Sequence, residues 1–273
     1  MKIFIDDAKL DNIKEMYSYG IVDGVTTNPS LMKKAIDALK KSGKKVAMDA
    51  YIKQILKIAK GTPVSLEVIG SNYKDMVEEG LRIYKKFNPV AKNVYVKIPV
   101  NPAFGKQQND FDGVKAIRYL SKKGIPINCT LIFTPEQALL AAKAGAKFLS
   151  PFAGRIDDLL RKNAKVKFEK TDYYPAEGMV KGKKLLQDNG ITSGVELIAE
   201  CVEIVQLHGL KAEVLAASLR NPRQIRECAL AGADIATIPY GVLQDLLKHQ
   251  KTVEGMENFT KDIVPEYRKI VRG

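Results

Sequence analysis

Short apolar runs alternate with amphipathic stretches along the whole of this 273-residue chain. The apolar runs are rich in Val and Ile and are short, as is typical of buried strands. They predict strands at residues 2–6, 21–26, 63–68, 93–98, 126–131, 147–150, 212–217 and 234–238. Between them, apolar residues recur at helical spacing. This spacing predicts helices at 9–18, 30–41, 46–59, 72–86, 110–123, 135–144, 194–208, 222–231, 240–248 and 255–270.

Capping signals support several of these helix boundaries. Thr134 precedes Pro135 and is followed three residues later by Gln137, which is the pattern of an N-cap, a proline in the first turn and a capping box. Asn221-Pro222 repeats the pattern, and Ser193 with Glu196 forms another capping box. Glycines stand where helices should end, at Gly124, Gly145, Gly209 and Gly232.

Eight strands, each followed by a helix, predict a single-domain (β/α)8 barrel over residues 1–273, with extra helices. An open, doubly wound sheet is the alternative. It loses support because no Gly-x-Gly-x-x-Gly motif follows the first strand. Two stretches fit the barrel less well. One is a polar loop at 101–109, and the other is a charged, aromatic and weakly periodic insertion at 160–192, which could form a lid, an interface element or a partly disordered loop.

The fourth strand contains a lysine, in the run Val94-Tyr95-Val96-Lys97-Ile98-Pro99. Side chains alternate between the faces of a strand, so Lys97 shares a face with Tyr95, opposite Val94, Val96 and Ile98. Inside a barrel, burial disfavours the ammonium form, and a neutral amine can form a Schiff base with a carbonyl substrate. The alternative is an edge-strand lysine that points to solvent.

Other strands place polar residues on the face that corresponds to Lys97. The alternation predicts that the inward side chains are Asp6, Ser65, Glu67, Asn128, Thr130, Phe148, Ser150, Ala216 and Ser218. Acids, an amine, an amide and hydroxyls would thus converge at the C-terminal mouth, where barrels of this type carry out chemistry. Structural roles remain open for some of them. Asp6 could cap a loop, Glu67 could only neutralise Lys97, and Thr130 could bond to a backbone carbonyl.

Two arginines follow neighbouring strands, Arg155 after the sixth and Arg220 after the seventh. The planar guanidinium group suits phosphate. The Ser218 hydroxyl and the helix that starts after Asn221 would add hydrogen-bond donors and positive potential. Surface salt bridges are the alternative role for both arginines.

Composition narrows the function further. The net charge of +13 raises the possibility of a nucleic-acid or other polyanion partner, but the lysines are scattered and lack interleaved aromatic residues. A basic surface also suits sugar phosphates. His208 and His249 lie away from the strand ends, so we expect surface or structural roles for both and no metal, which disfavours a zinc-dependent aldolase. Neither a membrane span nor a signal peptide is expected, and the isolated cysteines fit a cytoplasmic protein without disulfides.

These residues resemble the transaldolase family, which includes the fructose-6-phosphate aldolases, and they occur in the same order along the chain as in that family. The matching stretches are Phe4-Ile5-Asp6, Gly24 through Leu31, Val94 through Pro99, Asn128 through Phe133, Ser150 through Asp157, and Ala216 through Arg220. They cover most of the predicted barrel, whereas 101–109 and 160–192 match poorly. The resemblance implies a (β/α)8 barrel that acts without a cofactor and carries its Schiff-base lysine on the fourth strand.

The resemblance also implies a role for each matching residue. Lys97 would form the imine, Asp6 would be the acid–base residue, and Glu67 and Thr130 would hold a water for proton transfer. The substrate-binding residues would be Thr26, Asn28, Asn128, Ser150 and Phe152, and the phosphate-binding residues would be Arg155, Ser218 and Arg220.

The family contains both transferases and aldolases. In the fructose-6-phosphate aldolases, glutamine is typical at the position of Glu67 and tyrosine at that of Phe152, so the sequence favours a transaldolase that transfers a dihydroxyacetone unit between sugar phosphates. An aldolase that releases free dihydroxyacetone is the alternative, and a non-catalytic polyanion-binding protein is a third interpretation. The resemblance further implies a homo-oligomer, with pentamers or decamers in which the C-terminal helix, here 255–270, reaches a neighbour.

Overall fold

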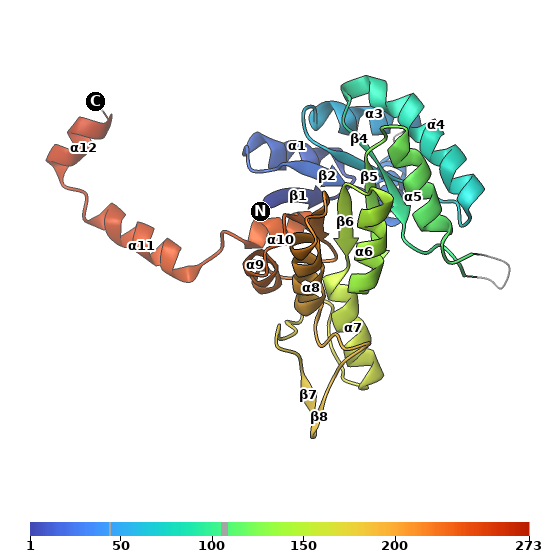
Figure 1. Cartoon of the computed structure of the whole chain (residues 1–273). Helices are drawn as coiled ribbons and strands as arrows, with labels where there is room; N and C mark the ends of the chain where they lie inside the picture. Colours follow the sequence, from blue (N-terminus) through green and yellow to red (C-terminus); the bar gives the residue numbers. More distant parts are fainter. Residues whose placement is uncertain (44, 105–108, 273) are drawn as a thin grey trace.

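The computed structural model describes residues 1–43, 45–104 and 109–272. Eight parallel strands form a closed barrel in the order β1-β10-β9-β6-β5-β4-β3-β2, which confirms the predicted (β/α)8 fold (Figure 1). The barrel strands are β1 (Lys2–Asp6), β2 (Gly24–Thr26), β3 (Val64–Glu67), β4 (Val94–Pro99), β5 (Ile127–Ile132), β6 (Phe148–Pro151), β9 (Glu213–Ala216) and β10 (Ile235–Ile238).

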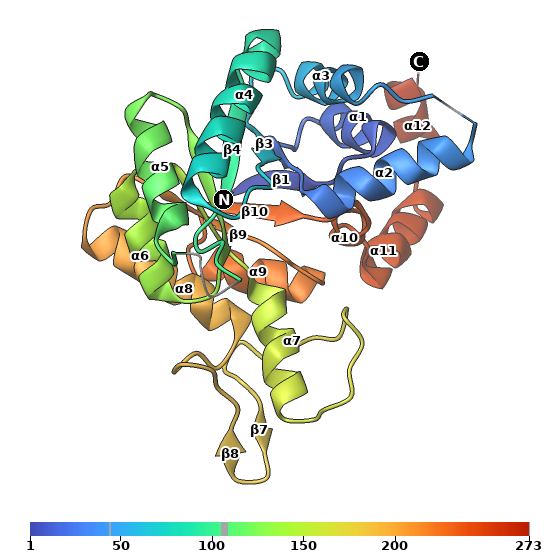
Figure 2. The same cartoon turned by 90° about the vertical axis from the view of Figure 1, so that its right-hand side faces the viewer.

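Helices cover the outside of the barrel (Figure 2). In chain order they are α1 (Leu10–Ser18), α2 (Pro29–Lys41), α3 (Met48–Ile58), α4 (Tyr73–Ala91), α5 (Asp112–Lys122), α6 (Pro135–Ala144), α7 (Ala153–Asn163), α8 (Gly194–Leu207), α9 (Pro222–Leu230) and α10 (Tyr240–Asp245). The capping predictions hold, because Thr134, Ser193 and Asn221 each accept a hydrogen bond from the backbone three residues on.

Several predicted boundaries are wrong. The strand predicted at 21–26 begins only at Gly24, and α7 was not predicted at all. The first residues of the predicted insertion at 160–192 belong to α7, and the insertion also contains a small antiparallel hairpin, β7 (Val180–Lys181) and β8 (Lys184–Leu185). The hairpin projects from the barrel next to α7 (Figures 1 and 2). Part of the predicted loop at 101–109 lies outside the described residues.

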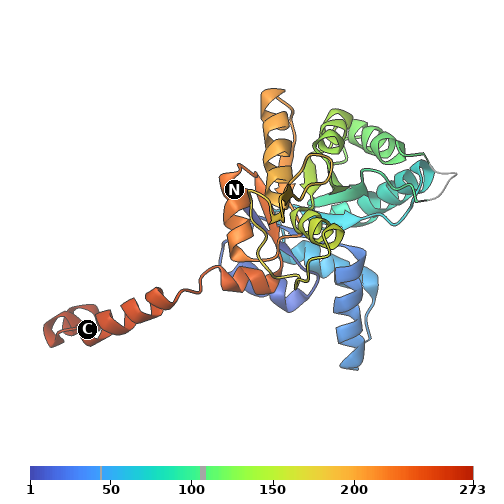
Figure 3. The ribbon, with the colours of Figure 1, turned by 90° about the horizontal axis from the view of Figure 1, so that it is seen from below.

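The C-terminal segment also differs from its prediction. The helix predicted at 255–270 is divided into α11 (Gln250–Lys261) and α12 (Pro265–Arg272), and the helix predicted at 240–248 ends at Asp245. His249 caps α11, and Pro265, which cannot continue a helix interior, starts α12. Neither helix has a buried residue, and both extend away from the barrel (Figures 1 and 3).

The barrel interior has an apolar lower part. Phe4, Phe148 and Leu215 are fully or almost fully buried there. The ring of Tyr95 stacks on that of Phe148 at a centroid distance of 4.5 Å, which confirms that Tyr95 and therefore Lys97 point inward. This aromatic floor closes the barrel beneath the polar residues at its C-terminal mouth.

One predicted orientation is wrong. Ala216 packs with the outer core between barrel and helices, whereas Leu215 and Ala217 belong to the inner cluster. Ser218 nevertheless lies at the mouth, because its backbone is in the left-handed region at φ 61° and the alternation of the strand no longer applies there. Among the described residues, no helix is long and apolar enough to cross a membrane.

Candidate active site

Lys97 lies inside the barrel with only 5% of its surface exposed. Its Nζ atom is 3.0 Å from Oε2 of Glu67 and donates a hydrogen bond of 3.3 Å to the backbone oxygen of Thr27. Strand register explains the first contact, because Glu67 and Lys97 are paired on β3 and β4. The edge-strand alternative for Lys97 is thus wrong, and the ion pair considered for Glu67 is present.

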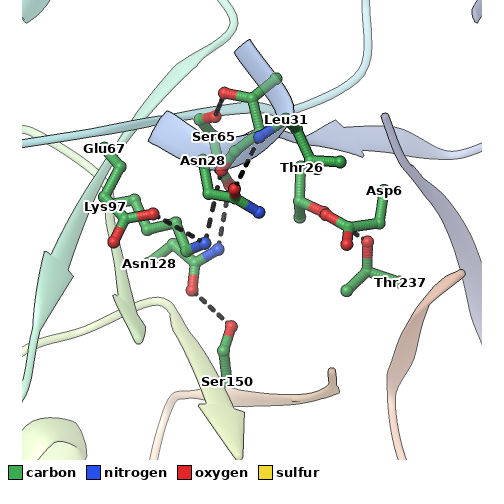
Figure 4. A network of polar contacts seen from close by, with 11 residues as sticks. Asp6, Thr26, Asn28, Leu31, Ser65, Glu67, Lys97, Asn128, Ser150 and Thr237 are labelled. Atoms are coloured by element: carbon green, nitrogen blue, oxygen red, sulfur yellow. Dashed lines mark hydrogen bonds and ion pairs between the residues drawn. The ribbon is translucent and has the colours of Figure 1, made fainter. Parts of the chain in front are cut away.

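Asp6 lies across the mouth from Lys97, at the end of β1 (Figure 4). Its Oδ1 atom accepts a hydrogen bond of 2.7 Å from the hydroxyl of Thr26, which in turn contacts the hydroxyl of Thr237 on β10. Burial raises the pKa of Asp6 above its ordinary value, while the positive charge of Lys97 and the Thr26 hydrogen bond oppose that shift. A carboxylate of raised pKa is the stronger base when it is ionised.

A second polar chain runs beneath the amine. The Asn128 side chain donates to Oγ of Ser65 at 3.0 Å, and its oxygen accepts a hydrogen bond of 2.7 Å from Ser150. All three residues are fully or almost fully buried. Because Asn128 is in register with Lys97 on the adjacent strand, the chain fixes the amide beside the amine. Figure 4 shows Lys97 and Asn128 on one side of the mouth, with Asp6 and Thr237 on the other.

On β3 and β5, the two strands that flank the Lys97 strand, two buried side-chain oxygen atoms have no hydrogen-bond partner among the described residues. They are Oε2 of Glu67, which lies in the ion pair but is not aligned for a hydrogen bond, and Oγ1 of Thr130. Thr130 does not bond to a backbone carbonyl, which was its alternative role. Buried polar atoms are ordinarily satisfied, so these two are suited to bind a polar group that the protein itself does not supply.

The phosphate residues predicted from the sequence lie at the rim. Arg220 forms a 3.0 Å ion pair with Asp158, so the salt-bridge alternative holds for this residue, but its Nε atom is buried without a partner. Arg155 is exposed and lies 4.9 Å from the centre of the Phe152 ring. The position of Arg220 is fixed by Gln224, whose Oε1 accepts from the Arg220 backbone and whose amide donates to Asp157.

Asn28 and Phe152 complete the predicted set. Oδ1 of Asn28 accepts a hydrogen bond from the backbone of Leu31 and so caps α2, which holds the side chain at the mouth. The ring of Phe152 packs against that of Phe133 at a centroid distance of 5.8 Å.

A single cavity of about 430 Å³ connects most of these residues. The predicted site residues that line it are Asp6, Thr26, Asn28, Lys97, Ser150, Phe152, Arg155, Ser218 and Arg220. Glu67, Asn128 and Thr130 do not line it. Register pairs Glu67 and Asn128 with Lys97, and Thr130 with Pro99 at the end of the Lys97 strand. The volume is sufficient for a small polar metabolite, and the lining offers an amine, a carboxylate, hydroxyls and cations.

The sequence interpretation missed four of the polar lining residues, which are Ser30, Lys34, Lys170 and Thr237. Thr237 stands in an apolar strand, where a threonine gives no signal. Lys34 lies in the second turn of α2, and Lys170 comes from the predicted insertion. The described residues contain no group of three or more His, Cys, Asp or Glu that could hold a metal ion.

Comparison with known proteins shows which family the chain belongs to. The sequence profile described as Transaldolase/Fructose-6-phosphate aldolase matches residues 3–270. The chain belongs to this family. It is therefore an enzyme, since the family is a family of enzymes. The chain is 41% identical to a "Probable transaldolase" of Nitrosopumilus maritimus, in an alignment that covers 96% of this chain and 94% of that protein.

Other members of the family show a similar level of identity. A "Probable transaldolase" of Desulfatibacillum aliphaticivorans is 42% identical over 96% of this chain and 97% of its own length. One from Thermoplasma volcanium is 39% identical over 96% of this chain and 95% of its own length. Near full-length coverage on both sides means that the chain is similar to whole family members, including the barrel strands that carry the candidate site.

Proposed function

We propose that this enzyme is a transaldolase of the pentose phosphate pathway. It would transfer a dihydroxyacetone unit from a ketose phosphate, sedoheptulose 7-phosphate or fructose 6-phosphate, to an aldose phosphate, glyceraldehyde 3-phosphate or erythrose 4-phosphate. The observation that carries the proposal is the buried Lys97 amine, which lines one cavity together with Asp6, Arg155 and Arg220. This reaction needs three groups. They are an amine to attack the ketone, a base to remove the hydroxyl proton, and a cationic site to bind the phosphate.

The reaction begins at the Lys97 amine. The neutral Nζ attacks the C2 carbonyl of the ketose, a proton is returned to the resulting C2 hydroxyl, and loss of one water gives a cationic imine that withdraws electrons from C3. The ammonium must first lose a proton, and the Glu67 carboxylate at 3.0 Å is placed to accept it. The two buried atoms without partners, Oε2 of Glu67 and Oγ1 of Thr130, would hold the water that carries protons in this step.

Asp6 then acts as the base. The Asp6 carboxylate takes the proton of the C4 hydroxyl, and the C3–C4 bond breaks. The electron pair of that bond passes into the imine and forms an enamine. The aldose phosphate leaves, and the three-carbon enamine stays bound to Lys97. Asn128 and Ser150, which are fixed by their mutual hydrogen bond of 2.7 Å, would hold its hydroxyls. The enamine attacks the acceptor aldehyde, Asp6 returns the proton, and water hydrolyses the new imine.

The rim residues would bind the phosphate of either sugar. Arg155 and Ser218 line the cavity, and the unpartnered Nε atom of Arg220 offers a further donor. Guanidinium groups bind phosphate in a defined orientation, which places the aldose carbonyl relative to the enamine.

Transfer requires that the enamine is not protonated. Phe152 supports transfer over release, because its ring lines the cavity without offering a hydroxyl proton. Fructose 6-phosphate supplied without an acceptor aldehyde should therefore release little dihydroxyacetone, and Phe152→Tyr should release more. Rapid accumulation of dihydroxyacetone by the unmodified enzyme would instead identify an aldolase.

The decisive experiment is borohydride reduction in the presence of fructose 6-phosphate, followed by peptide mass mapping. The reduced adduct should be on Lys97 alone. Lys97→Met should abolish both labelling and transfer while the circular dichroism spectrum stays unchanged. Lys122→Met, at an exposed position on α5, is the matched control and should keep full activity. Labelling of another lysine, or of none, would refute the assignment.

The net charge of +13 keeps a polyanion-binding function open as a second candidate. Such binding would weaken steeply with salt and would not respond to Lys97→Met. Transfer activity that disappears in this variant separates the two.

We also propose a homo-oligomer in the cytoplasm. The support is the pair of terminal helices, which expose Met256, Phe259, Tyr267 and Ile270 to solvent in the single chain. Exposed apolar surface of this extent marks an interaction site. The three cysteines are buried and unpaired, as suits a reducing compartment. Sedimentation of the full chain and of a chain ended at residue 248 should show a larger assembly only for the former.

A further inference from the structure

The segment that joins α7 to α8 is fixed to the barrel by a buried arginine. Only 3% of the surface of Arg161 is exposed. Its Nη2 atom donates to the backbone oxygens of Asp172 and Tyr173, at 3.0 and 2.8 Å. The guanidinium carbon also lies 5.0 Å from the ring centres of both Phe168 and Tyr174. A buried arginine with this many partners is costly to displace, so it holds residues 168–174 in place.

A second set of contacts attaches the same residues to α9. The Tyr173 hydroxyl donates to Oε1 of Glu227 at 2.8 Å, and the Arg223 guanidinium lies 3.7 Å from the centre of the Tyr173 ring. The Asn221 side chain donates to the backbone oxygen of Thr171 at 3.4 Å. Residues 168–174 are thus held between α7 and α9, the two helices that follow the strands of the phosphate site.

Lys170 lies in the middle of this segment, and its place is set by those contacts. It lines the active-site cavity with Arg155 and Arg220. The same three cations, together with Lys162 and Asp158, line an adjoining cavity of about 570 Å³. No carboxylate within ion-pair distance of Lys170 or Arg155 is found among the described residues, whereas Arg220 pairs with Asp158. Cations that converge without matching carboxylates repel one another, and an anion between them removes that repulsion.

We propose that Lys170 is a third cation of the phosphate site, supplied by the segment between α7 and α8. This segment thereby increases the preference of the enzyme for phosphorylated over unphosphorylated sugars, beyond what Arg155 and Arg220 provide. The inference rests on the proposed function for its substrates, but the anion site itself does not depend on which reaction takes place. Lys170 is a specificity-determining residue here and takes no part in the proton transfers at Lys97 and Asp6.

The first test uses Lys170→Gln, a change at an exposed position that should not affect folding. The KM for erythrose 4-phosphate should rise about fivefold to tenfold, while kcat changes less than about twofold. The kcat/KM for unphosphorylated erythrose should not change. Lys170→Arg should restore most of the lost affinity. Lys167→Gln is the matched control, because Lys167 is exposed on the same segment and lines neither cavity.

The second test measures inorganic phosphate binding by ³¹P NMR and needs no turnover. The Kd of Lys170→Gln should exceed that of the unmodified enzyme and of Lys167→Gln by a similar factor, and added salt should reduce the difference. Equal phosphate affinity in all three proteins would overturn the inference. An equal loss of kcat/KM with both sugars would do the same. Failure of the borohydride labelling with unchanged phosphate results would refute the proposed function and leave this site intact.

Discussion

The first helical turn after β6 tests how tightly the phosphate site is built. Gly154 lies in this turn, and its backbone packs directly against the loop that follows β9. A Cβ atom added at Gly154 would stand 2.2 Å from the backbone oxygen of Ser218 and 2.5 Å from Nε of Arg220. Contacts below 3.0 Å do not occur for real Cβ atoms, so Gly154→Ala must move α7 or this loop.

Two opposing contributions determine how much Gly154→Ala changes the free energy of unfolding. Inserting a methyl group into a packed region costs about 1–3 kcal/mol, and alanine in a helix recovers up to about 1 kcal/mol relative to glycine. Because the close atom belongs to the backbone, a side-chain rotation cannot relieve the contact. We expect a net loss of about 1–2 kcal/mol, which lowers Tm by about 2–8 °C for a chain of this size.

The same displacement should affect substrate binding. Ser218 and Arg220 would move together, because they are two residues apart on one loop. A misplacement of about 1 Å can cost up to about 100-fold in rate, so we expect kcat/KM for erythrose 4-phosphate to fall at least tenfold. Borohydride labelling of Lys97 by unphosphorylated dihydroxyacetone should persist, since β4 is not involved.

Gly241→Ala supplies the control. Gly241 also stands early in a helix, its φ is not positive, and an added Cβ would meet no atom within 4 Å. Both variants gain the same helix propensity, so differential scanning calorimetry of the pair isolates the contact at Gly154. A Gly154→Ala enzyme that is as stable as Gly241→Ala and keeps its KM would show that the reasoning is wrong.

Two further predictions concern protons. Burial raises the pKa of Asp157 to about 7, so the folded protein binds this proton more tightly than the unfolded chain does. The free energy of unfolding that this proton contributes is fully present below about pH 4 and is lost as the pH rises through 7. Urea unfolding at pH 5 and pH 8 should show this loss, and Asp157→Asn should reduce it; an unchanged slope would contradict the assignment. The hydrogen bond from Thr26 lowers the pKa of Asp6, so Thr26→Val should raise it and move the acid limb of the kcat/KM profile to higher pH. A limb that stays in place, with the fold intact by circular dichroism, would argue against Asp6 as the base.

The sequence could predict the barrel because each strand carries its own signal. An inward side chain is fixed by alternation alone, so Lys97, Glu67 and Asn128 could be placed on the inner face before their neighbours were known. Their contacts depend in addition on register, which pairs Glu67 with Lys97 and Lys97 with Asn128. The prediction for Ala216 was wrong because it gave Ala216 and Ser218 the same face, whereas Ser218 lies beyond the end of β9 with its backbone in the left-handed region.

Residues outside the regular elements could not be placed in this way. The segment around Lys170 has no periodicity, and its position is decided by the contacts of Arg161 and Tyr173 with elements distant in the sequence. Thr237 was missed because a threonine in a strand is ordinary, and only its contact with Thr26 gives it a place in the site.

The sequence by itself thus determined the barrel and the inward direction of the Lys97 amine, because both follow from local spacing along single strands. The tertiary structure alone decided that this amine lies 3.0 Å from a carboxylate and that Lys170 joins two arginines at the rim. These distances depend on strand register and on the packing of segments far apart in the chain, which no local pattern contains.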